Sequence, residues 1–143
     1  AGFAGPMGAI VLGLIVSPIC LFFVSVIKNK LGYDDSLDVF GVHGVGGFVG
    51  ALLTGVFATS AVTGTSAQSG WIDGNPGQIL IQLEGIGATA AWTAIGTLVI
   101  LYVVKAITGL RVTSAEEMEG LDLTQHGESL EDGTDGAKVK KAA

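Results

Sequence analysis

One histidine, His43, is the residue in this sequence best placed to do chemistry. From Val39 to Val62 it is the only ionisable side chain in a long apolar run, so we expect it where water is scarce. A near-neutral imidazole can accept a proton on one nitrogen while the other donates, and ionisable groups inside membranes commonly mark ion or proton routes. We therefore expect His43 to line a pathway. The structural alternative is a simple hydrogen bond to a neighbouring helix.

The residues that share a helical face with His43 are small. Gly46, Gly47 and Gly50 follow it at helical spacing, which places all of them on its side of the helix. In a bilayer, helices associate through close packing, and small residues permit it. We predict that these three glycines form a helix-packing surface and that His43 points towards protein or a cavity.

Three apolar stretches are available to position this histidine. The chain is 49% hydrophobic and 14% charged, with a mean hydropathy of +0.62, a composition typical of membrane proteins. The stretches cover about residues 7–27, 38–60 and 78–107, and each is long enough to cross hydrocarbon as a helix. We predict an all-α membrane protein with three transmembrane helices within residues 1–112, and a kink rather than a break at Pro18.

Asp38 stands where the second stretch begins. A carboxylate at that position can accept the free amide protons of a helix start and complement the positive end of the helix dipole. We predict a structural capping role for Asp38 at the cytoplasmic end of the pore. Direct contact with a cation that leaves the pore is the alternative.

The basic residues predict an orientation. Two of the seven follow the first stretch and the other five lie at or after the end of the third, whereas residues 59–77 between the second and the third contain none. Under the positive-inside rule the flanks of Lys28, Lys30 and Arg111 are cytoplasmic and residues 59–77 are external. We expect a multi-pass protein of the cell membrane with a cytoplasmic tail.

The polar C-terminal part has its own pattern. Thr113 followed by Glu116 and Glu117 is typical of a helix start, and we predict a short helix in a cytoplasmic tail of residues 113–128. Residues 129–143 are polar, with repeated Asp-Gly, and we predict disorder there. The net charge of −6 is concentrated in this part, which argues against nucleic-acid binding.

Two groups of motifs resemble a known family. The run DDSLDVFGVHGVGG at residues 34–47 closely resembles the tenth transmembrane helix, with its lead-in loop, of the Amt/Mep/Rh ammonium transporters. The motifs GLRV at 109–112, EGLD at 119–122 and HGE at 126–128 resemble the cytoplasmic tail of the Amt branch. Together they correspond to the C-terminal third of such a transporter. Because the chain starts Ala1-Gly2-Phe3 without an initiator methionine, we expect it to be a piece of a longer polypeptide.

The resemblance implies a substrate and an assembly. Ammonium or ammonia, with methylammonium as an analogue, would cross the lipid bilayer through a homotrimer of eleven-helix subunits. In that family two histidines from different helices line a narrow hydrophobic pore; His43 matches the second, and its partner would precede this chain. Val39 matches a position in the pore wall, where an apolar side chain disfavours hydrated ions. Whether ammonium ion, ammonia, or ammonia with a separately routed proton is moved stays open.

The resemblance also implies a regulatory tail, because Amt tails are associated with gating and with PII-type regulatory proteins. The candidate tail residues are Arg111, Gly120, Asp122 and Thr124. A phosphate on Thr124 would add about −1.5 to −2 charge beside Asp122 and loosen a docked arm. A merely solvated tail is the alternative.

Other classes of function have less support. The sequence contains no phosphate-binding Gly-Lys-Ser/Thr run, no His-Glu-x-x-His and no Gly-x-Ser-x-Gly, so we expect neither an enzyme nor an ATP-driven pump. A haem or metal protein would need a second ligand besides His43, and the only other histidine, His126, belongs to the polar tail, so we expect no cofactor or metal. A sensor that binds ammonium without moving it, and signals through the tail, stays open as the alternative function.

Overall fold

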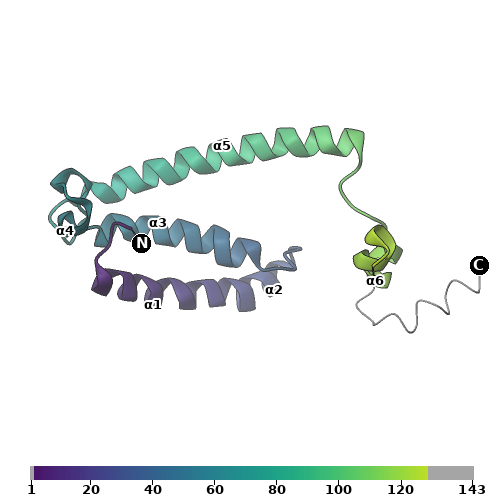
Figure 1. The fold of residues 1–143 in the computed structure, drawn as a ribbon, viewed down its shortest axis with the longest axis horizontal. Coiled ribbons are helices and arrows are strands. Elements are labelled where there is room, and N and C mark those ends of the chain that lie inside the picture. The colour runs from purple at the N-terminus through teal and green to yellow at the C-terminus, as the bar shows by residue number, and fades with distance from the viewer. Residues whose placement is uncertain (1, 129–143) are drawn as a thin grey trace, which may run out of the picture. The chain divides into compact units, whose positions relative to one another are not determined.

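The computed structural model describes residues 2–128 of the chain. Regular structure in these residues is helical, apart from one antiparallel bridge between Ala4 and Ala58 (Figure 1). The chain divides into two compact units, one that ends at Ile95 and one that begins at Gly96, and each is described by itself. The disorder predicted for residues 129–143 lies outside the described residues.

Within the described residues, three helices are long and apolar enough to cross a membrane. They run from Pro6 to Leu31, from Phe40 to Phe57 and from Gln78 to Ile107. This confirms the predicted all-α membrane architecture with three spans. The third span has the predicted bounds, whereas the first is longer and the second shorter than the hydropathy pattern indicates.

The first span combines three helical segments: α1 (Pro6–Phe22), the π-helical turn η1 (Phe23–Ile27) and α2 (Lys28–Leu31). Pro6 occupies the first turn of α1, where its missing N–H costs nothing. The helix continues through Pro18 without a break. It ends at Gly32, whose φ of 62° is left-handed and therefore suits glycine. The span passes the predicted end near residue 27 by one further helical turn, α2, which carries Lys28 and Lys30.

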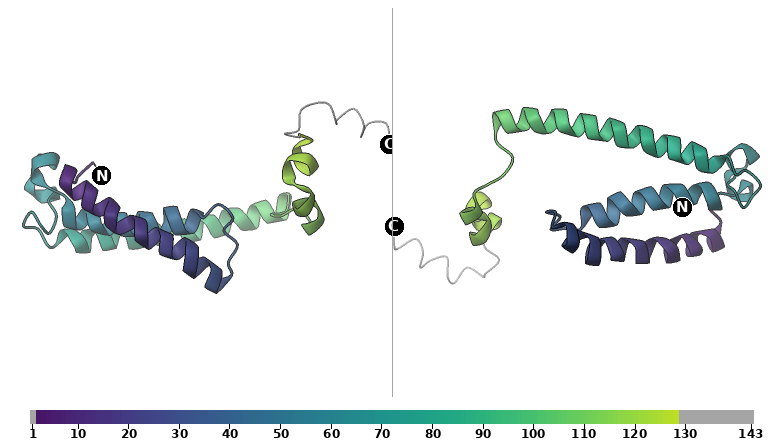
Figure 2. Two further views of the ribbon diagram at one scale, coloured as in Figure 1. Left: turned by 90° about the horizontal axis from the view of Figure 1, so that it is seen from below. Right: turned by 180° about the vertical axis from the view of Figure 1, so that it is seen from behind.

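The second span begins with the π-helical turn η2 (Phe40–Gly44) and continues as α3 (Val45–Phe57). It lies beside α1 and runs in the opposite direction (Figures 1 and 2). The helix ends at Phe57 rather than near residue 60, because Ala58 is extended and forms the bridge to Ala4.

The connection that follows contains two short helices, α4 (Ser60–Thr63) and η3 (Ser66–Gln68). Each starts at a threonine whose side-chain oxygen accepts a backbone N–H: Thr59 from Ala61, and Thr65 from Ala67. Side-chain caps of this kind satisfy amide protons that a helix start leaves free. The connection between the second and third spans is therefore folded, with two capped helical turns.

The third span, α5 (Gln78–Ile107), begins in the first unit and reaches into the second. In the first unit it packs closely on the end of α3: a Cβ added at Gly55 would lie 3.2 Å from both the carbonyl oxygen of Gln78 and the Cα of Ile79. None of the residues of α5 is buried within the described chain.

The described remainder of the second unit contains α6 (Ser114–Glu119) and the π-helical turn η4 (Asp122–His126). Thr113 caps α6, with Glu116 as the reciprocal partner of a capping box. This confirms the short helix predicted from the Thr113 pattern.

Candidate functional site

His43 lies in the π-helical turn η2, one residue before the turn ends at Gly44. A π turn closes its hydrogen bonds over five residues instead of four, and such turns are frequent at functional sites. The imidazole is exposed in the described chain. Two large apolar residues on the same stretch, Val39 and Phe40, are also about half exposed, at 51% and 55%. The start of the second span therefore offers one ionisable group among apolar ones.

Asp35, and not Asp38, caps this helix. Its carboxylate accepts the backbone N–H of Val39 at 2.8 Å through Oδ1 and that of Phe40 at 3.0 Å through Oδ2. Both amides belong to the first helical turn, where no backbone acceptor is available. The capping role predicted for Asp38 is therefore wrong: the turn that precedes the helix brings the carboxylate of Asp35 over the free amides.

Asp38 has a different partner. Lys28 Nζ donates to Asp38 Oδ1 at 2.6 Å, and the two side chains are 24% and 35% exposed. The ion pair joins the end of the first span to the start of the second. The prediction placed Asp38 correctly at a helix start, since its carbonyl oxygen accepts the N–H of Val42 at 2.9 Å. Sequence spacing alone could not show that its carboxylate turns towards Lys28.

The face of the second span that meets the first span carries two glycines. A Cβ added at Gly41 would lie 2.7 Å from Val24 Cγ2, and one at Gly46 would lie 3.2 Å from Cys20 Sγ. The packing role predicted for Gly46 therefore matches a close contact, whereas Gly41 was missed. Gly41 and Gly46 are five residues apart, a spacing that fits a π turn. The prediction used α-helical spacings of three, four and seven residues and therefore did not include Gly41.

The other two predicted packing glycines have open surroundings in this chain. A Cβ added at Gly47 or at Gly50 would meet no atom within 4 Å. Gly47 lines a cavity of about 770 Å³ between α3 and α5, together with apolar residues and with Gln82, Thr89 and Thr93. His43 is not among the residues that line this cavity. The packing role of Gly47 and Gly50 stays a prediction.

The opposite end of α3 is closed by backbone groups. The N–H groups of Gly70, Trp71 and Ile72 donate to the carbonyl oxygens of Ala58, Gly55 and Val56, at 2.7, 3.0 and 3.1 Å respectively. These acceptors belong to the last turn of α3 and the residue that follows it, where a helix leaves its carbonyls free. Sequence reasoning gave this segment no such role.

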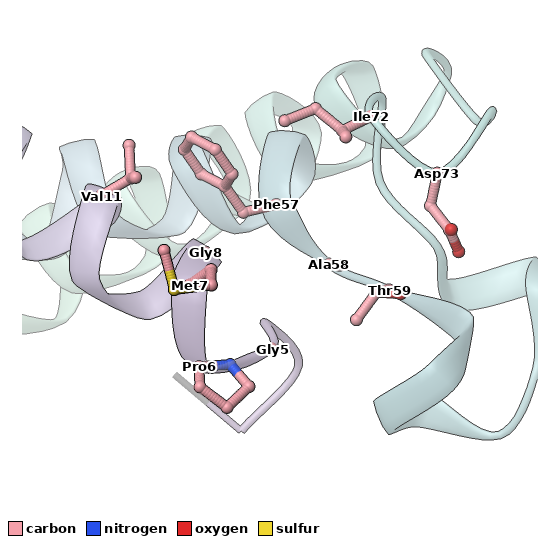
Figure 3. A pocket seen from close by; sticks show the side chains of 10 residues that line it. All are labelled: Gly5, Pro6, Met7, Gly8, Val11, Phe57, Ala58, Thr59, Ile72 and Asp73. Carbon is pink, nitrogen blue, oxygen red and sulfur yellow. The ribbon is translucent and has the colours of Figure 1, made fainter.

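A pocket of about 410 Å³ lies beside this end of the helix (Figure 3). Met7, Val11 and Phe57 gather at one end of it, and the carboxylate of Asp73 lies at the other. Asp73 Oδ2 accepts the N–H of Ser60 at 2.7 Å. This hydrogen bond stabilises the carboxylate and lowers the pKa of Asp73. The pocket is apolar except at this rim.

In the second unit, one candidate tail residue, Arg111, belongs to a small cluster at the start of α6. Arg111 Nε donates to Glu117 Oε1 at 2.6 Å, and this contact lowers the pKa of Glu117. Hydrogen bonds from the side chain and backbone of Thr113 lower the pKa of Glu116 in the same way. The acids of the first turn thus tie α6 to the segment before it.

Thr124 and Gly120 are in direct contact. Thr124 Oγ1 donates to the carbonyl oxygen of Gly120 at 3.0 Å, and the side chain is half-buried. Gly120 has a φ of 106°, which a residue with a side chain rarely adopts. Asp122, which lies between these two residues in the chain, begins η4. The Thr124 hydroxyl is therefore less accessible than its polar surroundings in the sequence indicate.

Comparison with known proteins identifies the family. The sequence profile of the Ammonium Transporter Family matches residues 1–131. The chain belongs to this family. Within the Ammonium Transporter Family, the ammonium transporter of Aquifex aeolicus is 55% identical over 128 residues, which cover 90% of this chain and 29% of that protein. The ammonium transporter of Bacillus subtilis is 44% identical, with coverage of 90% and 31%.

Solved structures of the Ammonium Transporter Family have the same fold. The crystal structure of Saccharomyces cerevisiae Mep2 aligns with a TM-score of 0.70 at 35% identity, over 96% of this chain and 29% of the Mep2 chain. That of Candida albicans Mep2 aligns with a TM-score of 0.69 at 36% identity, over 80% and 26%. The chain therefore spans less than a third of the length of these relatives. The resemblance seen in the sequence motifs is confirmed.

Proposed function

We propose that this chain supplies one pore helix, with the second pore histidine, of a transporter that conducts ammonium or ammonia. The observation that carries the proposal is the exposed His43 imidazole on an otherwise apolar helix start. Neither α1 nor the adjoining part of α5 covers it, so this side of the helix is free to face groups from the remaining helices of the family. A partner histidine from one of those helices would complete a paired site.

The chemistry of the substrate favours such a site. Ammonium and potassium ions are similar in size, so selectivity needs something that potassium cannot do, namely giving up a proton or donating directional hydrogen bonds. A histidine can take part in both, because its two ring nitrogens act as acceptor and donor. The apolar side chains of Val39 and Phe40 would disfavour hydrated ions beside it.

The test uses a transporter in which this chain is joined to the family's preceding helices, here called the full-length transporter. We would replace His43 with alanine and measure methylammonium uptake together with potassium currents, with His126→Ala as the matched control. Uptake at least about tenfold slower, or a new potassium current, is expected for His43→Ala alone. Unchanged uptake and selectivity would rule out the pathway role. Binding of methylammonium without uptake by the parent would instead favour the sensor.

The assembly and orientation belong to the same proposal. The full-length transporter would be a homotrimer in the cell membrane, with residues 59–77 external and the tail cytoplasmic, as the positions of the basic residues indicate. The mass of the purified complex tests the trimer. A membrane-impermeant thiol reagent should label Thr65→Cys in intact cells after Cys20 is replaced by serine. Labelling only after cell lysis would show that residue 65 is cytoplasmic, which is the opposite orientation.

The tail would act as a regulatory arm. The Thr113 capping box and the Arg111–Glu117 pair support a defined shape for α6, and the left-handed Gly120 supports a fixed turn after it. A phosphate on Thr124 would replace the hydrogen bond to Gly120 and repel Asp122. Binding of a PII-type regulator to this arm is part of the proposal.

Three changes test the arm in the full-length transporter at matched surface expression: Thr124→Asp, Gly120→Asp and a truncation after Val112. Reduced transport, or loss of the response to nitrogen status, is expected for each. Thr124→Val is the control, because it removes the hydroxyl without adding charge. If all three altered proteins behave like the parent, the segment is only a solvated tail.

A further inference from the structure

We infer that the ion pair between Lys28 and Asp38 positions His43, because it holds two facing π-helical turns in register. The inference rests on the proposed function, in which His43 lines the pore. It adds Lys28 and Asp38 as residues that position His43. Its elements are the turn η1 in the first span, the turn η2 in the second and the ion pair that joins their ends.

The two π turns face one another. Gly41 in η2 lies so close to Val24 in η1 that an added Cβ would be 2.7 Å from Val24 Cγ2 and 3.4 Å from the Val24 backbone nitrogen. One π turn holds one residue more than the α-helical turn that it replaces. If η2 relaxed to α-helix, the residues on one side of it would rotate by about 100° around the helix axis, the angle of one α-helical residue. The π turn therefore decides which way His43 points.

The ion pair is placed to prevent this relaxation. Lys28 directly follows η1, and Asp38 lies two residues before η2. Their contact of 2.6 Å is half-buried, with exposures of 24% and 35%. An ion pair that is partly removed from water contributes more than an exposed one, and loss of one partner costs more because the other charge is left without compensation.

The backbone of Asp38 shows what the pair holds in place. Asp38 has a φ of 56°, and among residues 2–128 it is the only residue other than glycine with a positive φ. This left-handed conformation is costly for most side chains, although Asp and Asn tolerate it best. From this conformation the Asp38 carbonyl accepts the N–H of Val42, next to His43, at 2.9 Å. The side chain that Lys28 binds thus belongs to the residue that sets the start of the helix.

The test compares variants of the full-length transporter. Lys28→Met removes the positive partner, and Asp38→Asn removes the negative one while it keeps a residue that tolerates a left-handed backbone. Lys28→Arg preserves the pair. Lys30→Met is the matched control, because it makes the same chemical change at an exposed lysine two residues further along. We would measure methylammonium uptake per molecule, the midpoint of thermal unfolding, and the ¹⁵N chemical shifts of the His43 ring.

We expect uptake to fall roughly tenfold in Lys28→Met and in Asp38→Asn, between the effects of exposed and buried ion pairs. The double variant should be no worse than the more damaging single one, since both remove the same interaction. Lys28→Arg should retain at least about half of the parent uptake, and Lys30→Met should equal the parent. The ring signals of His43 should move in the two single variants and stay in the control.

Single variants that take up methylammonium like Lys30→Met would overturn the inference. So would an unfolding midpoint that falls while uptake per molecule is unchanged, or ring signals that stay at the parent positions. If Asp38→Asn does not fold, the lysine variants decide, because they leave the backbone of Asp38 unaltered. A parent without uptake contradicts the proposed function alone, and the His43 ring signals then still test the positioning.

Discussion

At its N-terminal end the helix that carries His43 is held by charged side chains, whereas at its C-terminal end it is held by backbone amides. Asp35 accepts two amides of the first turn, and Asp38 binds Lys28. At the other end, the N–H groups of residues 70–72 cover the last carbonyls. The same helix therefore ends in two chemically different ways.

The difference follows from what each helix end leaves free. An N-terminus exposes N–H groups, which side-chain carboxylates can accept, whereas a C-terminus exposes carbonyls, which need donors. When the donors are backbone amides, the chain that supplies them must approach closely. Changes of charge at the N-terminal end should therefore lower the stability moderately. Added side-chain volume at the C-terminal end should lower it more.

The largest effect is expected at Gly70. An added Cβ would lie 2.7 Å from the carbonyl oxygen of Val56 and 2.8 Å from that of Gly55, and neither backbone group can move without loss of the cap. We expect Gly70→Ala to destabilise the protein by about 3 kcal/mol, the range of severe overpacking. The unfolding midpoint of the purified full-length transporter measures this.

Gly77→Ala is the control for that measurement. Gly77 lies in the same connection, and an added Cβ would be 3.4 Å from the side-chain oxygen of Asn75, an ordinary contact. A parent-like midpoint is expected there. If the unfolding midpoint of Gly70→Ala also equals that of the parent, the backbone contacts of Gly70 do not stabilise the C-terminal end of α3.

A smaller effect is expected at Asp35. Asp35→Ala removes the acceptor for the amides of Val39 and Phe40, and loss of such a cap costs about 1 kcal/mol. Asp35→Asn retains one oxygen acceptor and should cost less. The measurement is the unfolding midpoint together with amide hydrogen exchange at Val39 and Phe40. Equal exchange in the alanine variant and the parent would show that the cap contributes nothing.

The smallest effect is expected from pH at the C-terminal end. The hydrogen bond from Ser60 lowers the pKa of Asp73, so its contribution to stability is present above the ordinary Asp pKa of about 3.9 and is lost as pH falls through the lower folded value. The amide signal of Ser60 should titrate with a midpoint below 3.9 in the parent and not in Asp73→Asn. A midpoint at or above the ordinary value would contradict this.

Hydropathy and capping patterns in the sequence were sufficient to predict the three long helices and the short helix α6. The three apolar stretches became three helices, and Thr113 with Glu116 formed the predicted capping box, because both signals depend on residues close together in the chain. The motif around His43 was sufficient to identify the family, since its residue types and order are specific. These features need no knowledge of what packs against them.

The tertiary structure alone decided how the helix with His43 is held. Asp34, Asp35 and Asp38 all precede it in sequence, and only the folded turn shows that Asp35 caps the helix while Asp38 binds Lys28. The close contact of Gly41 with Val24 and the cap at Gly70 likewise depend on residues distant in sequence. The physical reason is that hydrophobicity and propensity are local properties, whereas hydrogen-bond partners and close approaches are fixed only when helices pack.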